Sequence, residues 1–382
     1  TYLKIVLGDV ELGESLLHWV NDGLMVIFFF LVGLEIKREV LVGELASLRQ
    51  ATLPLMAAVG GMVVPAAIYL LFNLGGVAEA GWGIPMATDI AFLLGLLTLL
   101  GSRIPVSLKV FFTALAIADD LGAVLVIAIF YSSNVSWIAL VVAVVFLIAL
   151  IILNWGQVRQ PLPYIVLGIG LWLAFLQSGI HPTIAGVLLA MTIPARTEVR
   201  SEAFLAQCTS ALGRFEPGEL TGEESGRQQA AAQTLESIAE RLQAPLRRLE
   251  HSLNPWVAYL IVPIFAFANA GVHIRGDIAA VLTSPLFLGI LGGLVLGKPL
   301  GITLFSWIAV KLGIAELPAD VTWPQRVSAS WLAGIGFTMA LFIANSAFAD
   351  PILLDIAKFS ILIASLLASV IGSGLLLLTT ST

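Results

Sequence analysis

Two adjacent aspartates, Asp119 and Asp120, stand near the middle of a segment that is otherwise almost entirely apolar. From Val106 to Tyr131 the only other charged residue is Lys109. Apolar runs of about 20 residues, the length that crosses a bilayer as a helix, recur along the chain. The chain is 59% hydrophobic and 12% charged, with a mean hydropathy of +0.99. These features predict an all-α polytopic membrane protein, because continuous apolar runs favour helices over the alternating strands of a barrel.

Composition excludes several other classes. The single Cys excludes an internal disulfide framework, and the net charge of −6 argues against a nucleic-acid partner. The chain begins with Thr1 instead of Met and has no cleavable signal pattern. We therefore expect the natural N-terminus to lie further upstream.

The apolar runs predict eleven transmembrane helices, at 16–41, 51–73, 82–100, 106–131, 136–154, 163–176, 179–194, 254–272, 284–311, 326–348 and 356–379. Lys and Arg collect in the cytoplasmic loops of membrane proteins. Here they gather on alternate loops, and the opposite side keeps only Lys4, Arg275 and Lys358. This pattern places the N-terminus outside and the C-terminus inside.

The chain divides into five predicted segments. They are an extracellular hairpin at 1–15, an interface-domain helix with a cytoplasmic funnel at 16–50, a first core repeat at 51–131, interface helices with a cytoplasmic loop (195–253) at 132–283, and a second core repeat at 284–382. The hairpin is predicted because polar and apolar residues alternate around Gly8 and Asp9. Its unpaired edges suggest a homodimer contact.

Charged residues inside spans are read as functional, because an ionised side chain at mid-bilayer costs roughly 2.5 to 3.5 kcal/mol. The predicted spans contain Asp22, Asp89, Asp119, Asp120 and Lys298. Two neighbouring carboxylates in an apolar site hold protons more tightly than isolated ones. Their oxygens also suit a hard cation such as Na⁺ or Li⁺. Adjacent helical residues point about 100° apart, so we expect one aspartate to bind the ion directly and the other to pair elsewhere.

Lys298, in "VLGKPLGI", is the natural partner for Asp119. It lies near the middle of its span between Gly297 and Pro299, where the helix is weakened. A lone buried cation would be costly, whereas opposite Asp119 it forms an ion pair that a proton or Na⁺ could disturb.

Two spans are predicted to be broken. In "GWGIPMATDIAFLLG", Gly83 and Pro85 interrupt the helix just before Thr88 and Asp89. In "WLAGIGFTMALFIANSAF", two glycines, the second of them Gly336, precede Thr338. Crossed broken helices leave partial charges near the bilayer centre. We expect Asp89 to offset the positive ends rather than to bind the ion.

Each broken span is the second of three consecutive spans, namely 51–73, 82–100 and 106–131 in one set and 284–311, 326–348 and 356–379 in the other. By loop counting, the first set starts inside and the second starts outside. The sequence therefore predicts an inverted repeat of three helices.

Motifs along nearly the whole chain resemble those of the NhaA-type bacterial sodium/proton antiporters. The motifs are "VGLEIKRE", "ASLRQA", "TDIAFLLG", "ALAIADDLGAV", "PWVAYLIVPIFAFANAGV", "LGKPLGI" and "GIGFTMALFIA". NhaA is itself a known example of an inverted repeat whose discontinuous helices form a midplane ion site. The resemblance implies a twelfth helix ahead of the hairpin, with both termini inside.

The resemblance also implies roles for individual residues. Asp119 and Asp120 would be the ion- and proton-binding pair, with Na⁺ as the metal, and Lys298 the partner of Asp119. Thr88, Asp89 and Gly336 would lie at the helix crossing, and we add Thr338 from the break itself. A pH-regulation funnel would consist of Glu35, Arg38, Glu39, Glu250 and His251. Asp22 and His181 also match family positions, whereas Asn254 stands where some members have His.

The residues alone allow plainer interpretations of these regulatory positions. A charged helix end at the membrane interface accounts for Glu35, Arg38 and Glu39, and a capping role accounts for His181 beside Pro182.

By resemblance, the chain is a secondary transporter of the bacterial inner membrane and not an enzyme. It would exchange cytoplasmic Na⁺ or Li⁺ for external protons by alternating access, electrogenically and under pH regulation, with no cofactor besides the transported ions. Its partners would be these ions, the lipid bilayer and a second copy. A sodium- or proton-coupled organic anion symporter is the alternative, although such a site calls for a cationic clamp. An intramembrane aspartyl protease fits less well, because it needs its two aspartates on separate facing helices.

Overall fold

The computed structural model describes residues 2–7, 10–132, 135–195, 244–273, 278–318 and 320–380. Most of the cytoplasmic loop predicted at 195–253 lies outside the described residues. The elements of the first half are β1 (Tyr2–Leu7), β2 (Val10–Ser15), α1 (Leu16–His18), η1 (Trp19–Leu24), α2 (Met25–Val42), α3 (Leu48–Asn73), η2 (Glu79–Met86), α4 (Ile90–Leu99), η3 (Gly101–Arg103), α5 (Val106–Phe130), α6 (Trp137–Trp155), α7 (Pro161–Ser178) and α8 (Ile184–Thr192).

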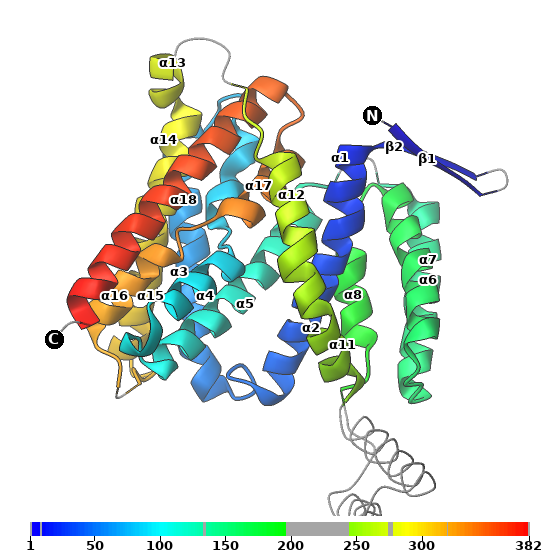
Figure 1. Ribbon diagram of the computed structural model, residues 1–382, viewed down its shortest axis with the longest axis horizontal. Helices are drawn as coiled ribbons and strands as arrows, with labels where there is room; N and C mark the ends of the chain where they lie inside the picture. Colours follow the sequence, from blue (N-terminus) through cyan, green and yellow to red (C-terminus); the bar gives the residue numbers. More distant parts are fainter. Residues whose placement is uncertain are drawn as a thin grey trace, which may run out of the picture.

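The second half continues the helical pattern. Its elements are α11 (Pro245–Trp256), η4 (Val257–Ile261), α12 (Val262–Asn269), α13 (Ile278–Leu282), α14 (Pro285–Leu291), η5 (Gly292–Gly297), α15 (Lys298–Lys311), α16 (Trp323–Leu332), α17 (Phe337–Ala347) and α18 (Pro351–Thr380). In Figure 1, α18 lies along one side of the molecule and α6 and α7 along the other, with α2 and α12 between them.

The helices confirm a polytopic membrane protein. Among the described residues, eight helical stretches are long and apolar enough to cross a membrane, and the bent pair α16 and α17 makes a ninth. These nine correspond to nine of the eleven predicted spans. The remaining two, at 16–41 and 179–194, do not meet that test as single apolar helices. The 18 residues of α2 include four charged residues, and α8 has nine residues.

The predicted hairpin is present. Strands β1 and β2 pair antiparallel, with Tyr2 opposite Ser15 and Leu7 opposite Val10. In Figure 1 the hairpin projects sideways from the end of the bundle at which α1 begins.

Both predicted helix breaks are also present. A short extended stretch, Ala87–Asp89, separates η2 from α4. A turn between Leu332 and Phe337 separates α16 from α17, and the two helices differ in direction by 48°. Proline and glycine cause these breaks, since Pro85 lacks a backbone donor and Gly334 and Gly336 weaken the helix.

The closest helix contact in the core joins α3 to α15. A Cβ added at Gly60 would meet the carbonyl oxygen of Gly301, and one added at Gly301 would meet that of Gly60. Small residues at this position let the two backbones approach, as is usual for helices packed in a membrane. This contact fixes the position of α15, which begins with Lys298, against the first repeat.

Candidate ion-binding site

The two helix breaks meet through backbone and side-chain hydrogen bonds. The backbone N–H of Asp89 donates to the carbonyl of Ile335 at 2.7 Å. The Thr88 hydroxyl lies 2.9 Å from the carbonyl of Ala333 and 2.8 Å from Asp119 Oδ2. A hydroxyl has one proton, so Thr88 can donate to only one of these acceptors at a time. Thr88 therefore connects the first break to Asp119, and the Ala333 carbonyl of the second break lies beside the same hydroxyl.

Asp89 caps two helices at once and is only 2% exposed. Its Oδ1 accepts the backbone N–H of Phe92 in the first turn of α4 at 3.1 Å. Its Oδ2 accepts the backbone N–H of Thr338 at 3.1 Å and the Thr338 hydroxyl at 2.5 Å, at the start of α17. The positive ends of both helices therefore face one carboxylate, which is the arrangement that favours a negative charge.

Asp119 is engaged by two partners. It lies on α5 and is 1% exposed, and its Oδ2 accepts from the Lys298 ammonium group and lies within hydrogen-bonding distance of Thr88. Lys298 has no exposed surface. The structure thus brings together the ion pair expected from the sequence, with one residue from each predicted repeat.

Asp120 has the opposite environment. It is 1% exposed, and neither of its carboxylate oxygens has a hydrogen-bond partner among the described residues. Asp119 Oδ1 is likewise without a partner. Buried carboxylate oxygens that lack donors are costly as bare anions. Three such oxygens on neighbouring residues are well suited to protons or to a small hard cation.

The described residues include no group of three or more His, Cys, Asp or Glu side chains that could hold a metal ion. A cation at Asp120 would therefore need further ligands of other kinds, such as backbone carbonyls, hydroxyls or water.

Comparison with known proteins identifies the family. The sequence profile of the family described as "Na+/H+ antiporter 1" matches residues 1–376. The chain belongs to this family. It is 53% identical over 364 residues to the Na⁺/H⁺ antiporter NhaA of Oleidesulfovibrio alaskensis, covering 94% of this chain and 81% of that protein. The protein of the same name from Koribacter versatilis is 54% identical over 366 residues, covering 96% and 80%, and that from Citrobacter koseri is 47% identical over 375 residues, covering 97% and 86%.

The family and the apolar helices together establish the cellular location. This Na⁺/H⁺ antiporter family member is a multi-pass protein of the bacterial inner membrane.

Four of the five residues predicted for the pH-regulation funnel lie together where α2 meets α11. Arg38 contacts Glu250 at 3.1 Å and Glu39 at 3.7 Å. Glu35 is within electrostatic range of the same three residues. His251 is exposed on α11, and in the described part of the chain no hydrogen bond or ion pair joins it to the others. The structure therefore groups Glu35, Arg38, Glu39 and Glu250 but leaves His251 outside.

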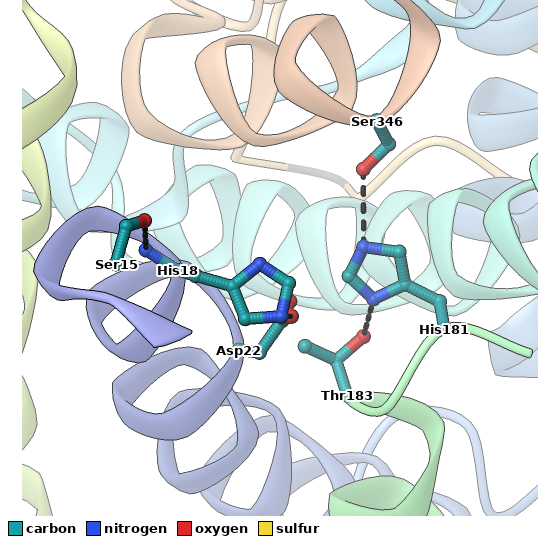
Figure 2. Close-up of polar contacts among 6 residues, drawn as sticks. All are labelled: Ser15, His18, Asp22, His181, Thr183 and Ser346. Atoms are coloured by element: carbon teal, nitrogen blue, oxygen red, sulfur yellow. Dashed lines mark hydrogen bonds and ion pairs between the residues drawn. The ribbon is translucent and has the colours of Figure 1, made fainter. Parts of the chain in front are cut away.

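Further polar residues make two separate sets of contacts (Figure 2), one within the segment of α1 and η1 and one that joins the turn before α8 to α17. His18 Nε2 lies 2.9 Å from an oxygen of Asp22 on the next turn. His181 Nδ1 lies 2.9 Å from the Thr183 hydroxyl, and its Nε2 lies 3.2 Å from the hydroxyl of Ser346 on α17. Figure 2 shows the imidazole of His181 between these two hydroxyls. His181 therefore links the turn before α8 to the core helix α17, while Asp22 pairs with His18.

Several polar contacts between helices of this antiporter were not predicted from the sequence. The Lys37 ammonium group donates to the carbonyls of Met191 and Ile193, at 2.6 and 2.5 Å, and so caps the C-terminal end of α8. Asn269 donates to Asn21 at 2.7 Å and accepts from Asn345 at 3.0 Å, which links η1, α12 and α17. Lys37 stands beside other charged residues, and asparagine side chains carry no charge, so no sequence pattern marks these contacts.

Two cations near the ends of predicted spans are buried in helices. Arg326 is 1% exposed on α16, and Lys358 is 7% exposed on α18. Neither is among the charged residues that the sequence analysis counted inside the predicted spans. Their positions near predicted helix ends concealed the burial, because Arg and Lys near a span end usually reach toward the interface.

Proposed function

We propose that the chain exchanges cytoplasmic Na⁺ or Li⁺ for external protons by alternating access around Asp119 and Asp120. The observation that carries this proposal is the buried Asp120 carboxylate, whose two oxygens lack hydrogen-bond partners among the described residues. The relatives named Na⁺/H⁺ antiporter support the same ions. A site of this kind binds a proton or a cation in turn, because either one supplies the missing positive charge.

Competition between the ions drives the exchange. Facing the cytoplasm, deprotonated Asp120 and Asp119 take up Na⁺. Facing outside, protons displace the ion and return inward. Lys298 holds Asp119 when no cation is bound, so arrival of Na⁺ or of a proton weakens the ion pair. Asp89 stays in place as the anion that stabilises the two helix N-termini at the crossing.

Exchange of two protons for one Na⁺ moves one net positive charge inward in each cycle. A membrane potential that is negative inside then favours Na⁺ extrusion by about 2.3 kcal/mol per charge per 100 mV. Regulation by pH is assigned to the cluster of Glu35, Arg38, Glu39 and Glu250, where α2 contacts α11. The protein acts as a transporter without a resident cofactor, and the hairpin at residues 2–15 serves as the contact with a second copy.

Proton flux in proteoliposomes tests the proposal. Addition of Na⁺ or Li⁺, but not K⁺, is expected to dequench a pH-sensitive dye, and Asp120→Asn is expected to abolish both this response and Na⁺ binding. Asp320→Asn, which changes an exposed carboxylate hydrogen-bonded to Ser107, is the matched control and keeps full activity. Sodium-dependent flux that persists in the Asp120→Asn variant would refute the assignment.

The stoichiometry needs a separate measurement. A potassium diffusion potential, negative inside, is expected to accelerate Na⁺ efflux from the same vesicles. An efflux rate that does not respond to the potential would show one-for-one exchange and contradict the electrogenic cycle.

A further inference from the structure

Arg326 is a buried cation that the proposed cycle does not use. It lies on α16 with 1% of its surface exposed. One guanidinium nitrogen donates to the Ser306 hydroxyl at 2.7 Å, and the guanidinium carbon lies 4.1 Å from the ring centre of Phe111 and 5.6 Å from that of Trp323. Among the described residues, its Nε has no hydrogen-bond partner and no carboxylate forms an ion pair with the guanidinium.

The charge of Arg326 is therefore weakly compensated. Aromatic faces and one hydroxyl stabilise a guanidinium only partly, because they carry no negative charge. Little water surrounds it, so its field is screened less than that of a surface residue. Lys311 makes an instructive contrast. It also lies over an aromatic ring, that of Trp307 at 4.5 Å, but its side chain is exposed at the end of α15.

Two helices independently fix the position of Arg326 relative to the ion site. Phe111, which stacks on the guanidinium, precedes Asp119 by eight residues on α5. Ser306, which accepts its hydrogen bond, follows Lys298 by eight residues on α15. Eight residues of α-helix rise about 12 Å. Both paths thus place the guanidinium about two turns from the ion pair of Asp119 and Lys298, toward the start of α5 and the end of α15.

We propose that Arg326 is an affinity-determining residue that weakens cation binding at Asp119 and Asp120. The inference rests on the proposed function, since it concerns the same site. A positive charge about 12 Å away in surroundings of effective dielectric constant about 20 opposes a bound cation enough to change its dissociation constant about tenfold. Weaker binding speeds release of the ion on the outer side, which a transporter requires as much as it requires uptake.

The test compares charge-removing and charge-keeping substitutions at one alkaline pH. The apparent KM for Na⁺ is measured by dequenching in proteoliposomes, and Kd is measured by titration calorimetry in detergent. In Arg326→Gln both constants are expected to fall about tenfold while kcat does not rise. In Arg326→Lys, which keeps the charge, both constants stay at the parent value. In Lys311→Gln, which removes an exposed charge from the same end of α15, they also stay unchanged.

Arg326→Met keeps the test decisive where the glutamine variant does not fold, because it removes the charge without leaving an amide to be satisfied. An unchanged or raised Kd for Na⁺ in either charge-removing variant would overturn the inference. So would an equal fall in Arg326→Lys, because the effect would then come from packing and not from charge. A parent protein that neither binds nor exchanges Na⁺ would overturn the proposed function itself, and with it this inference.

Discussion

Replacement of Lys298 with alanine tests the energetics of the ion pair most directly. Both side chains of the pair with Asp119 have no exposed surface. Removal of one partner of a fully buried pair typically costs about 3 to 5 kcal/mol, because the remaining charge has no compensation. Asp119 retains only its contact with the Thr88 hydroxyl, which also has the Ala333 carbonyl within reach. We therefore expect Lys298→Ala to fall in the upper part of that range at alkaline pH.

The destabilisation has a defined pH dependence. Protonation of Asp119 removes the stranded negative charge, so the stability deficit of Lys298→Ala is expected to shrink as the pH falls. The double variant Lys298→Ala with Asp119→Ala removes both charges and leaves only the lost packing. Its loss of stability at alkaline pH is expected to be smaller than the sum of the losses in the two single variants. The difference, which is the coupling energy, is expected to be about 2 to 3 kcal/mol.

The stability of all three variants and the parent is compared by thermal unfolding of the purified proteins in detergent over a range of pH. Two results would refute the reasoning. One is a deficit for Lys298→Ala that does not change with pH. The other is a double variant whose destabilisation equals the sum of the single ones, since that would show no energetic link between the two side chains.

Three further substitutions test the helix contacts through the same melting measurement. Asp89→Ala removes the cap of two helix N-termini and is expected to lower stability by about 2 kcal/mol. Asp89→Asn is expected to lose less stability, because asparagine is itself a good capping residue. Equal losses in the two variants would contradict the capping role. Gly301→Ala places a methyl group against a carbonyl of α3 and is expected to lower the free energy of unfolding by about 1 to 3 kcal/mol. Gly374→Ala is the control, because a Cβ there meets nothing within 4 Å, and it is expected to be neutral or stabilising. Lys37→Met leaves the last carbonyls of α8 without their cap and is expected to cost about 1 to 2 kcal/mol, and an unchanged melting temperature would refute that role.

The parts of the site that the sequence predicted are those with a strong local signal. Charges in apolar spans are rare enough that Asp119, Asp120 and Lys298 stand out. The breaks around Thr88 and Asp89 follow from glycine and proline. In the structure Asp89 accepts hydrogen bonds from the first turns of both α4 and α17.

The parts that the sequence did not predict depend on which segments meet in space. The carbonyls of Ala333 and Ile335 accept hydrogen bonds at the crossing, yet every residue has a carbonyl and no side-chain pattern marks these two. Arg326 is buried because the packing of α16 against α5 and α15 places it between Phe111 and Ser306. Helix breaks are local events, whereas the contacts across them are not.

The charges at the crossing limit how the exchange can work. Asp89 is compensated by two helix N-termini, and Asp119 is compensated by Lys298. Only Asp120 lacks a partner among the described residues. One Na⁺ or one proton held by Asp120 alone would therefore leave the ion pair undisturbed and give one-for-one exchange, in contrast to the proposed uptake of Na⁺ by both aspartates. A second proton has to be carried by the Asp119–Lys298 pair itself, and an electrogenic cycle consequently requires that this pair separate once in every turnover.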